Sequence, residues 1–349
     1  MTPFFPTPDY QQIAKNFLSE LTSASQNKQS SLSFIKNTFP TQPLVQRGLV
    51  QVFVIGGTNY ETSKATIAPD GSITELENGR KTEKVPKFLD KHSFIHFIEN
   101  LIDPACTAIA INFAWPIEPT KGSFGELDGI LIHGTKEHLF EGLLGKAIGA
   151  TIKKAINFDK PITVVNDTVC LGQNGLVVGS GFNICLNSTN LEAGSFNDFP
   201  PTDELEIIDH ISKNKGYGRF EKMLSGNYLP LQYNLLAKNH QSGLPHLVSG
   251  KELTKLAETD GTEAGDLARA LLNRSARLVA AAIAGAYLFL NEDKLTFQTD
   301  GSLFWKGWEY KKTVEEALAT LGVPQGSITF SYKKDIAIKG AFTLFTRTK

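Results

Sequence analysis

The chain has 349 residues, more than twice the roughly 150 residues of a typical domain, so its length predicts two lobes with a sizeable core. Its 35 Lys and Arg balance 36 Asp and Glu to a net charge of -1, which excludes a long-range attraction to nucleic acid or anionic membranes. With 41% apolar and 20% charged residues, the composition is typical of a folded protein and excludes a disordered one.

The sequence gives no sign of a membrane span, a secretory leader or a disulfide framework. Its longest apolar run, Leu278 to Leu290, has 13 residues, fewer than the roughly 20 that span a bilayer. The first eight residues hold three prolines and no basic residue, unlike a secretory leader. Because Cys106, Cys170 and Cys185 form no CxxC pair, we expect neither structural zinc nor disulfides, and a cytoplasmic location.

Hydrophobic periodicity predicts that helices and strands alternate along the chain. Tyr10–Leu21 has apolar residues on one side of a helix, which the polar residues 23–31 end. The further strands are expected at Gln51–Ile55, Lys64–Ala68, Thr107–Phe113, Ile162–Val165, Gly175–Val178 and Asn183–Leu186, and the further helices at Ala147–Ile156, Phe220–Tyr228 and Glu263–Leu290. This order predicts two α/β units whose junction lies near residues 165–168.

Two glycine-rich turns follow strands at corresponding places in the two units. The first is Gly56-Gly57-Thr58-Asn59, and the second is Gly179-Ser180-Gly181-Phe182-Asn183. Each is by itself an ordinary hairpin connection, but bare backbone N–H groups also approach anions closely, and the matched pair favours a nucleotide held between two units. The chain has no GxxxxGK[ST] loop, and the second turn leads into a strand, which argues against a dinucleotide-binding fold.

Asp167 follows the expected buried strand Ile162–Val165 at its carboxyl end, where open α/β sheets place their ligands. Two interpretations of this carboxylate stay open at this point. It is either the N-cap of a short helix or a general base that takes the proton of an attacking hydroxyl during phosphoryl transfer.

Motifs along most of the chain resemble those of the hexokinases, ATP-dependent sugar kinases of the actin-like nucleotidase fold. The motifs are Gly56–Asn59, Phe113-Ala114-Trp115-Pro116, Thr135-Lys136, Val165–Val169, Gly175–Asn183, Asn190–Gly194, Phe220–Leu229, Asp300-Gly301-Ser302 and Lys339-Gly340-Ala341. They occur in the family's order between Ser33 and Lys349, and Phe220–Leu229 is the most specific of them. The resemblance implies a two-lobed α/β fold, an actin-like ATPase with duplicated ribonuclease H-like units and a ligand cleft between the lobes.

The resemblance also implies a division of the chain into three segments. Residues 1–50 would form an N-terminal helical segment that packs on the large lobe. Residues 51–165, completed by 339–349, would form the small lobe with the first phosphate loop. Residues 166–338 would form the large lobe with the second phosphate loop, the sugar carboxylates and the adenosine segment.

A hexose site with a catalytic base is the next implication of the resemblance. Asp167 would act on the sugar 6-hydroxyl, and Lys136 would lie near the transferred phosphoryl group. The residues implied to hold the sugar are Thr135, Lys136, Asn166, Asp167, Asn183, Glu192 and Glu221. Carboxylates and amides suit a hexose because each of its hydroxyls both donates and accepts hydrogen bonds. Without the resemblance, Lys136 and Glu192 would be interpreted as solvated surface charges.

ATP and Mg²⁺ are implied as cofactors, with no protein residue assigned as a metal ligand. The residues implied to hold the nucleotide are Gly56, Gly57, Thr58, Asn59, Gly179, Ser180, Gly181, Gly226, Asn227, Gly301 and Ser302. Asp300-Gly301 is also an ordinary turn dipeptide, so its assignment depends on the resemblance.

Three positions depart from the family pattern. Val54 replaces an Asp that helps to hold magnesium through water, and Glu61 replaces an Arg near the nucleotide phosphates. Ala114 replaces a Ser that hydrogen-bonds the sugar. The first two changes weaken the side of the site that handles metal and phosphate.

The resemblance implies ATP-dependent phosphorylation of a glucose-like hexose at its 6-hydroxyl, with hexose and ATP as partners and neither nucleic acid nor a membrane. The alternative is a hexokinase-like sugar-binding or regulatory protein with little or no catalysis, given Val54, Glu61 and Ala114. A kinase of the repressor-related sugar kinase family is disfavoured because the chain lacks that family's cysteine-rich zinc segment.

Overall fold

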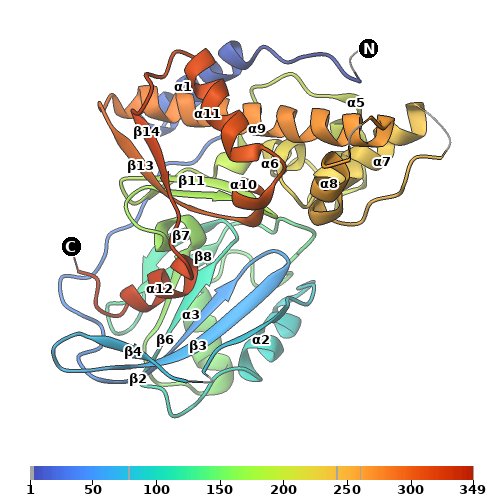
Figure 1. Cartoon of the computed structure of the whole chain (residues 1–349). Coiled ribbons are helices and arrows are strands. Elements are labelled where there is room, and N and C mark those ends of the chain that lie inside the picture. Colours follow the sequence, from blue (N-terminus) through green and yellow to red (C-terminus); the bar gives the residue numbers. More distant parts are fainter. Residues whose placement is uncertain (1–3, 78, 241–242, 260, 349) are drawn as a thin grey trace. The chain divides into compact units, whose positions relative to one another are not determined.

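The computed structural model describes residues 4–77, 79–240, 243–259 and 261–348 (Figure 1). The chain divides into two compact units. Unit 1 comprises the residues up to Phe34, Leu176–Leu186 and Leu191–Ser331, and unit 2 comprises Ile35–Gly175, Asn187–Asn190 and the residues from Tyr332 onward. None of the described helices is long and apolar enough to cross a bilayer.

Unit 2 is built on a sheet in which three neighbouring strands run parallel. The strand order is β4 (Ile73–Glu75), β3 (Asn59–Ile67), β2 (Gly48–Ile55), β6 (Ala108–Phe113) and β9 (Ile162–Asn166), and β5 (Lys81–Lys84) also pairs with β3. β2 and β3 form an antiparallel hairpin, whereas β2, β6 and β9 are parallel. The loops that follow these three parallel strands therefore leave the same edge of the sheet.

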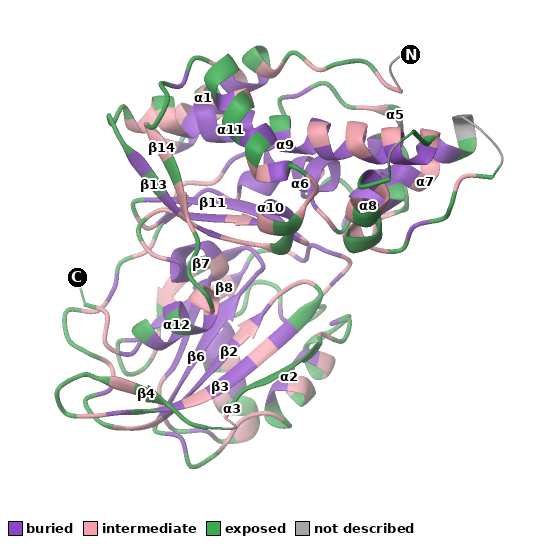
Figure 2. Cartoon of the chain, in the orientation of Figure 1, coloured by how far each residue is buried: buried purple, intermediate pink, exposed green. Residues whose placement is uncertain are grey.

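The two faces of this sheet differ in what covers them. One face carries large apolar side chains such as Phe53, Ile111 and Val164, which form a core with helices α2 (Lys91–Glu99) and α3 (Ile148–Ile156). The other face carries smaller residues, and helix α12 (Ile336–Thr343) packs on β2 and β6. Cover on both faces explains why β6 is buried along its whole length, as Figure 2 shows.

The side chain of Asp128 holds the start of helix α3 in unit 2. The Asp128 carboxylate accepts hydrogen bonds from the N–H groups of Gly149 and Ala150 at the start of α3. Burial raises the pKa of Asp128, and these N–H donors oppose that rise.

The other elements of unit 2 are β1 (Ile35–Lys36), which pairs with β12 (Thr189–Asn190), the hairpin β7 (Ile117–Lys121) and β8 (Leu127–Leu131), and the short helix α4 (Asp167–Cys170).

Unit 1 combines a sheet with most of the helices. Its strands follow the order β11 (Phe182–Leu186), β10 (Gly175–Val178), β13 (Leu295–Asp300) and β14 (Ile328–Ser331). The helical segments are α1 (Tyr10–Ser25), η1 (Ala193–Ser195), α5 (Asp203–Ile211), α6 (Arg219–Leu224), α7 (Leu229–His240), α8 (Gly250–Ala257), α9 (Glu263–Leu290), α10 (Ser302–Lys306) and α11 (Tyr310–Thr320).

Helix α9 is the central element of unit 1. It has 28 residues, and the Thr262 hydroxyl caps its first turn by accepting from the Gly265 N–H. Its small buried residues allow α1, α8 and α11 to pack against it, and Figure 1 shows α1 and α9 beside each other. At the closest approach, a Cβ on Gly285 would lie 2.8 Å from the Ala14 carbonyl oxygen and 3.1 Å from the Leu18 nitrogen.

Most elements expected from periodicity are present, with shifted ends. Helix α9 has the expected bounds, but the helix expected at Phe220–Tyr228 ends at Leu224, because Gly226 and Asn227 form a turn instead. The N-terminal segment expected as one piece divides at Phe34 between the units, and residues 166–175 and 332–338 group with unit 2. These boundaries differ because α4 and α12 pack on the sheet of unit 2.

We predict that Gly285→Ala destabilises unit 1, although alanine favours a helix over glycine by about 1 kcal/mol. The added methyl group forces α1 away from α9, and we expect thermal denaturation to show a lower melting temperature. Leu288→Ala is the control, because Leu288 is 51% exposed on the same helix and its truncation is expected to change stability little. A Gly285→Ala variant as stable as the unsubstituted chain would contradict the close packing.

Candidate functional site

In unit 2, three loops follow the parallel strands at one sheet edge. Gly56 to Asn59 follow β2, Ala114 follows β6, and Asp167 follows β9. The first loop is held by hydrogen bonds from the Gly56 N–H to the Asn59 oxygen (3.0 Å) and from the Val85 N–H to the Thr58 oxygen (3.0 Å). The side chains of Thr58 and Asn59 are exposed. This edge is where open α/β sheets bind ligands.

Lys136 connects the first glycine loop with the end of β6. Its ammonium group donates to the Ala114 carbonyl oxygen at 2.6 Å, and its Cδ would lie 2.7 Å from a Cβ on Gly57. Glycine is thus required at position 57 because the lysine side chain fills that space. The preceding Thr135 is fixed by its carbonyl oxygen, which accepts from the Trp115 indole N–H at 3.1 Å. Lys136 is buried, with 9% exposure, and is not a solvated surface charge.

Asn166, and not Asp167, caps the short helix α4. Asn166 Oδ1 accepts from the Thr168 N–H at 3.1 Å and from the Thr168 hydroxyl at 2.7 Å. Asp167 is the first helical residue, half-buried, and its Oδ1 also accepts from the Thr168 N–H at 2.8 Å. Of the two interpretations of Asp167, the N-cap is therefore excluded.

In unit 1, the other three expected sugar residues lie together. Asn183 Oδ1 accepts from the N–H of Ala193, the residue after Glu192, at 2.9 Å, and Glu221 Oε2 accepts from the Phe182 N–H at 3.0 Å. A Cβ on Gly194 would lie 3.0 Å from the Cβ of Glu221. The end of the second glycine turn, η1 and α6 thus bring an amide and two carboxylates to one place.

The glycines expected at the nucleotide also gather in unit 1. The Gly226 N–H donates to the Gly179 oxygen at 2.8 Å, and a Cβ on Gly179 would lie 3.2 Å from the Gly301 Cα. Gly301 has φ +117°, and an added Cβ would overlap the Val178 carbonyl. Ser180 and Gly181 lie in the same turn, with Asn227 next to Gly226 and Ser302 at the start of α10. These close backbone contacts explain the glycines at all three positions.

Arg80 neutralises the carboxylate that reverses the charge beside the first loop. Its guanidinium forms ion pairs with Glu61 on β3 and, at 2.7 Å, with Asp335 at the start of α12. The hydrogen bond from Arg80 lowers the pKa of Asp335. Nothing in the sequence pattern pointed to Arg80, because it lies 19 residues after its partner Glu61.

The residues of unit 2 fit a hydrated magnesium ion. The described residues contain no group of three or more His, Cys, Asp and Glu side chains that could hold a metal. Mg²⁺ usually keeps several waters and takes only one or two carboxylates, which Asp167 can provide. The same sheet contains the buried amide of Asn112. Its Oδ1 and Nδ2 have no hydrogen-bond partner among the described residues, so they are further polar atoms near the site.

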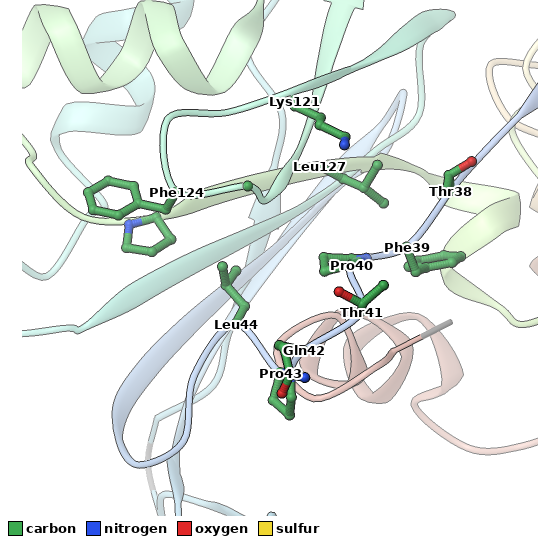
Figure 3. Close-up of a pocket in the computed structure, with 12 residues that line it drawn as sticks. Thr38, Phe39, Pro40, Thr41, Gln42, Pro43, Leu44, Lys121, Phe124 and Leu127 are labelled. Atoms are coloured by element: carbon green, nitrogen blue, oxygen red, sulfur yellow. The ribbon is translucent and has the colours of Figure 1, made fainter.

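A separate cavity of about 490 Å³ lies elsewhere in unit 2 (Figure 3). It is lined by residues 38–44, by the β7–β8 hairpin and by Pro161. Because Pro161 precedes β9 and Asp167 follows it, this cavity is at the opposite end of the strand from the candidate site. It contains none of the expected site residues.

Comparisons with known proteins agree with the sequence motifs. A family model described as hexokinase matches residues 257–345. Hexokinase-2 of Equus caballus is 26% identical over 95% of this chain and 45% of its own length, and hexokinase-2 of Homo sapiens is 26% identical over 82% and 40%. The chain thus spans about half the length of these curated relatives or less.

Solved structures identify the fold. The hexokinase of Schistosoma mansoni, complexed with glucose, matches with a TM-score of 0.79 over 97% of this chain and 94% of its own, at 18% identity. A second hexokinase structure matches over 98% of this chain with a TM-score of 0.68. These likenesses confirm the expected α/β fold of the actin-like ATPase type. The assignments of individual sugar and nucleotide residues stay predictions.

We predict that Arg80→Ala lowers stability at neutral pH by about 1 kcal/mol or less, because its two ion pairs are partly solvated. Since Arg80 lowers the folded-state pKa of Asp335, its stabilisation is present above the ordinary Asp pKa of about 3.9 and is lost as the pH falls through the depressed value. The difference in melting temperature between the two proteins should therefore shrink as the pH falls below about 4. Lys312→Ala, which removes an exposed pair with Glu309, is the control. A difference that grows in acid would contradict this role.

Proposed function

Because this chain belongs to the hexokinase family, we propose that it transfers the γ-phosphoryl group of ATP to the 6-hydroxyl of a glucose-like hexose. The observation that carries the proposal is the contact of Lys136 with Gly57 and Ala114. It brings a cation, a glycine loop and the end of β6 together at the sheet edge where Asp167 follows the neighbouring strand. A cation and a carboxylate beside a phosphate loop are what phosphoryl transfer to an alcohol requires.

Polar side chains would hold the sugar through hydrogen bonds to its hydroxyls. Support for this comes from Asn183, Glu192 and Glu221, which lie together in unit 1 and carry the acceptors that hexose hydroxyls need. Thr135 and Asn166 are the further proposed sugar ligands. Specificity for a sugar over an apolar analogue would follow, because these polar groups lose hydrogen bonds when an apolar group takes the place of a hydroxyl.

In the proposed reaction, Asp167 accepts the proton of the sugar 6-hydroxyl while the oxygen attacks the γ-phosphorus of ATP. The bond between the γ-phosphorus and the bridging oxygen breaks, and ADP leaves with that electron pair. Lys136 offsets negative charge on the transferred group. In the turns Gly56–Asn59 and Gly179–Gly181, the backbone N–H groups that are not used inside the turn itself would donate to the phosphates. Magnesium, when bound, would supply positive charge to the phosphates, and the Asp167 carboxylate would contact its water shell.

A second candidate is a sugar-binding regulatory protein without turnover. The observation in its favour is Val54, whose side chain offers no polar atom to a hydrated cation at the end of β2. The ion pair of Arg80 with Glu61 favours the enzyme instead, because it removes a negative charge that would repel ATP. Glucose binding without turnover in the unsubstituted chain would support the regulatory protein.

We predict that Asp167→Asn lowers kcat by about 10²- to 10⁴-fold, which is the usual contribution of a general base. Glucose binding should be nearly unchanged. A coupled assay of ADP formation and calorimetry with glucose measure the two effects. Asp159→Asn is the matched control, because Asp159 is exposed and precedes β9, whereas Asp167 follows it. Turnover that survives in Asp167→Asn would rule out Asp167 as the base.

We predict that Glu221→Gln raises the KM for glucose about 10- to 100-fold, in line with the about 1.5–3 kcal/mol of a hydrogen bond to a charged group. The KM for ATP should change little, since Glu221 lies with the sugar residues. Glu258→Gln, at an exposed position of unit 1, is the control. Equal increases in both KM values would instead indicate a general distortion of unit 1, which unfolding measurements would detect.

A further inference from the structure

Asn112 is a buried amide with no hydrogen-bond partner among the described residues. It lies on the central strand β6 with 1% exposure, and neither Oδ1 nor Nδ2 is satisfied. Buried side-chain amides are nearly always hydrogen-bonded, and an exception usually marks a bound water, an ion or a functional site. Asn112 therefore requires an explanation that the fold alone does not give.

The neighbours of Asn112 make the amide still less expected. In the strand register it pairs with Val54 on β2 and with Val165 on β9, so it interrupts a row of valines. Asparagine is also disfavoured in strands, where β-branched residues pack well. A valine at position 112 would complete the row without any unsatisfied polar atom, so the asparagine costs free energy of folding that a valine would not.

The row that contains Asn112 lies directly under the candidate site. Val54, Asn112 and Val165 each stand two residues before the loop residues Gly56, Ala114 and Asp167. Neighbouring strands are about 4.8 Å apart, so Asn112 is one strand away from Val54, below the first glycine loop, and one strand away from Val165, below Asp167. Asn112 is the residue of this row that has polar side-chain atoms.

We propose that Asn112 Oδ1 accepts a hydrogen bond from a water of the hydrated magnesium ion that accompanies the nucleotide. This inference rests on the proposed function. Magnesium releases its waters reluctantly, so protein oxygens commonly contact it through them. Asn112 thus provides, from the strand next to Val54, the acceptor that the Val54 side chain lacks, and as a neutral group it holds the ion less strongly than a carboxylate.

The test is calorimetric binding of ATP, with magnesium and with EDTA, to the full chain and three variants. Asn112→Val should weaken binding of magnesium–ATP about 10-fold, the loss expected for one hydrogen bond, without changing binding of ATP in EDTA. Its melting temperature should rise, because an unsatisfied amide is replaced by an apolar side chain. Asn112→Asp, which keeps an acceptor and adds charge, should bind magnesium–ATP at least as well as the unsubstituted chain. Thr163→Val, on the same face of β9, is the matched control and should bind normally.

Each contrary result overturns a different statement. A chain that binds no magnesium–ATP would overturn the proposed function together with this inference. If it binds and Asn112→Val binds equally well, only the role of Asn112 is overturned. A lower melting temperature with unchanged binding would make Asn112 a structural residue. If Asn112→Asp binds magnesium–ATP more weakly than Asn112→Val, the amide donates to a phosphate and the magnesium assignment is wrong.

Discussion

The candidate site depends on places where the backbone carries no side chain. In unit 1, Gly179 touches both Gly226 and Gly301, so the second glycine turn, the turn after α6 and the start of α10 meet through bare backbone. In unit 2, Gly57 leaves the space that Lys136 fills. The contacts of Gly179, Gly226 and Gly301 are with backbone atoms, so a Cβ there would force these segments apart. The N–H groups of these turns are thereby arranged before any ligand binds.

The net charge beside the first loop depends on ion pairs between residues that are far apart in the sequence. Glu61 follows the loop on β3, and alone it would repel a polyphosphate. Arg80 and Asp335 form ion pairs that tie the glutamate to the start of α12, the helix that covers β2 and β6. The negative charge of Glu61 is thus neutralised by Arg80, which comes close to it only in the folded chain. The same ion pairs fix α12 against the strands that carry the site.

The sequence predicted the fold and the local motifs better than the long-range contacts. Glycine turns, buried strands and the capped helix α9 depend on neighbouring residues, so periodicity located them. The position of α4 and α12 on the sheet of unit 2 depends on packing between segments far apart, and the expected boundaries at residues 166 and 338 differed there. Asn166 was expected as a sugar ligand, but the sequence did not show that it also caps α4. Arg80 gave no local signal, and the polar Asn112 inside an expected strand did not by itself indicate a role.

Asn112 and Val54 illustrate why the strength of a metal site need not follow from one position. The two residues are register partners, and an oxygen on either side chain would extend from nearly the same place on the sheet. A carboxylate on β2 would attract a hydrated cation strongly but would cost free energy when the cation is absent, since a charge would be buried among valines. An amide on β6 costs less folding free energy when the cation is absent. It also binds the hydrated cation less strongly when the cation is present. In the proposed role of Asn112, an amide on β6 in place of a carboxylate on β2 would therefore favour stability of the empty protein over metal affinity.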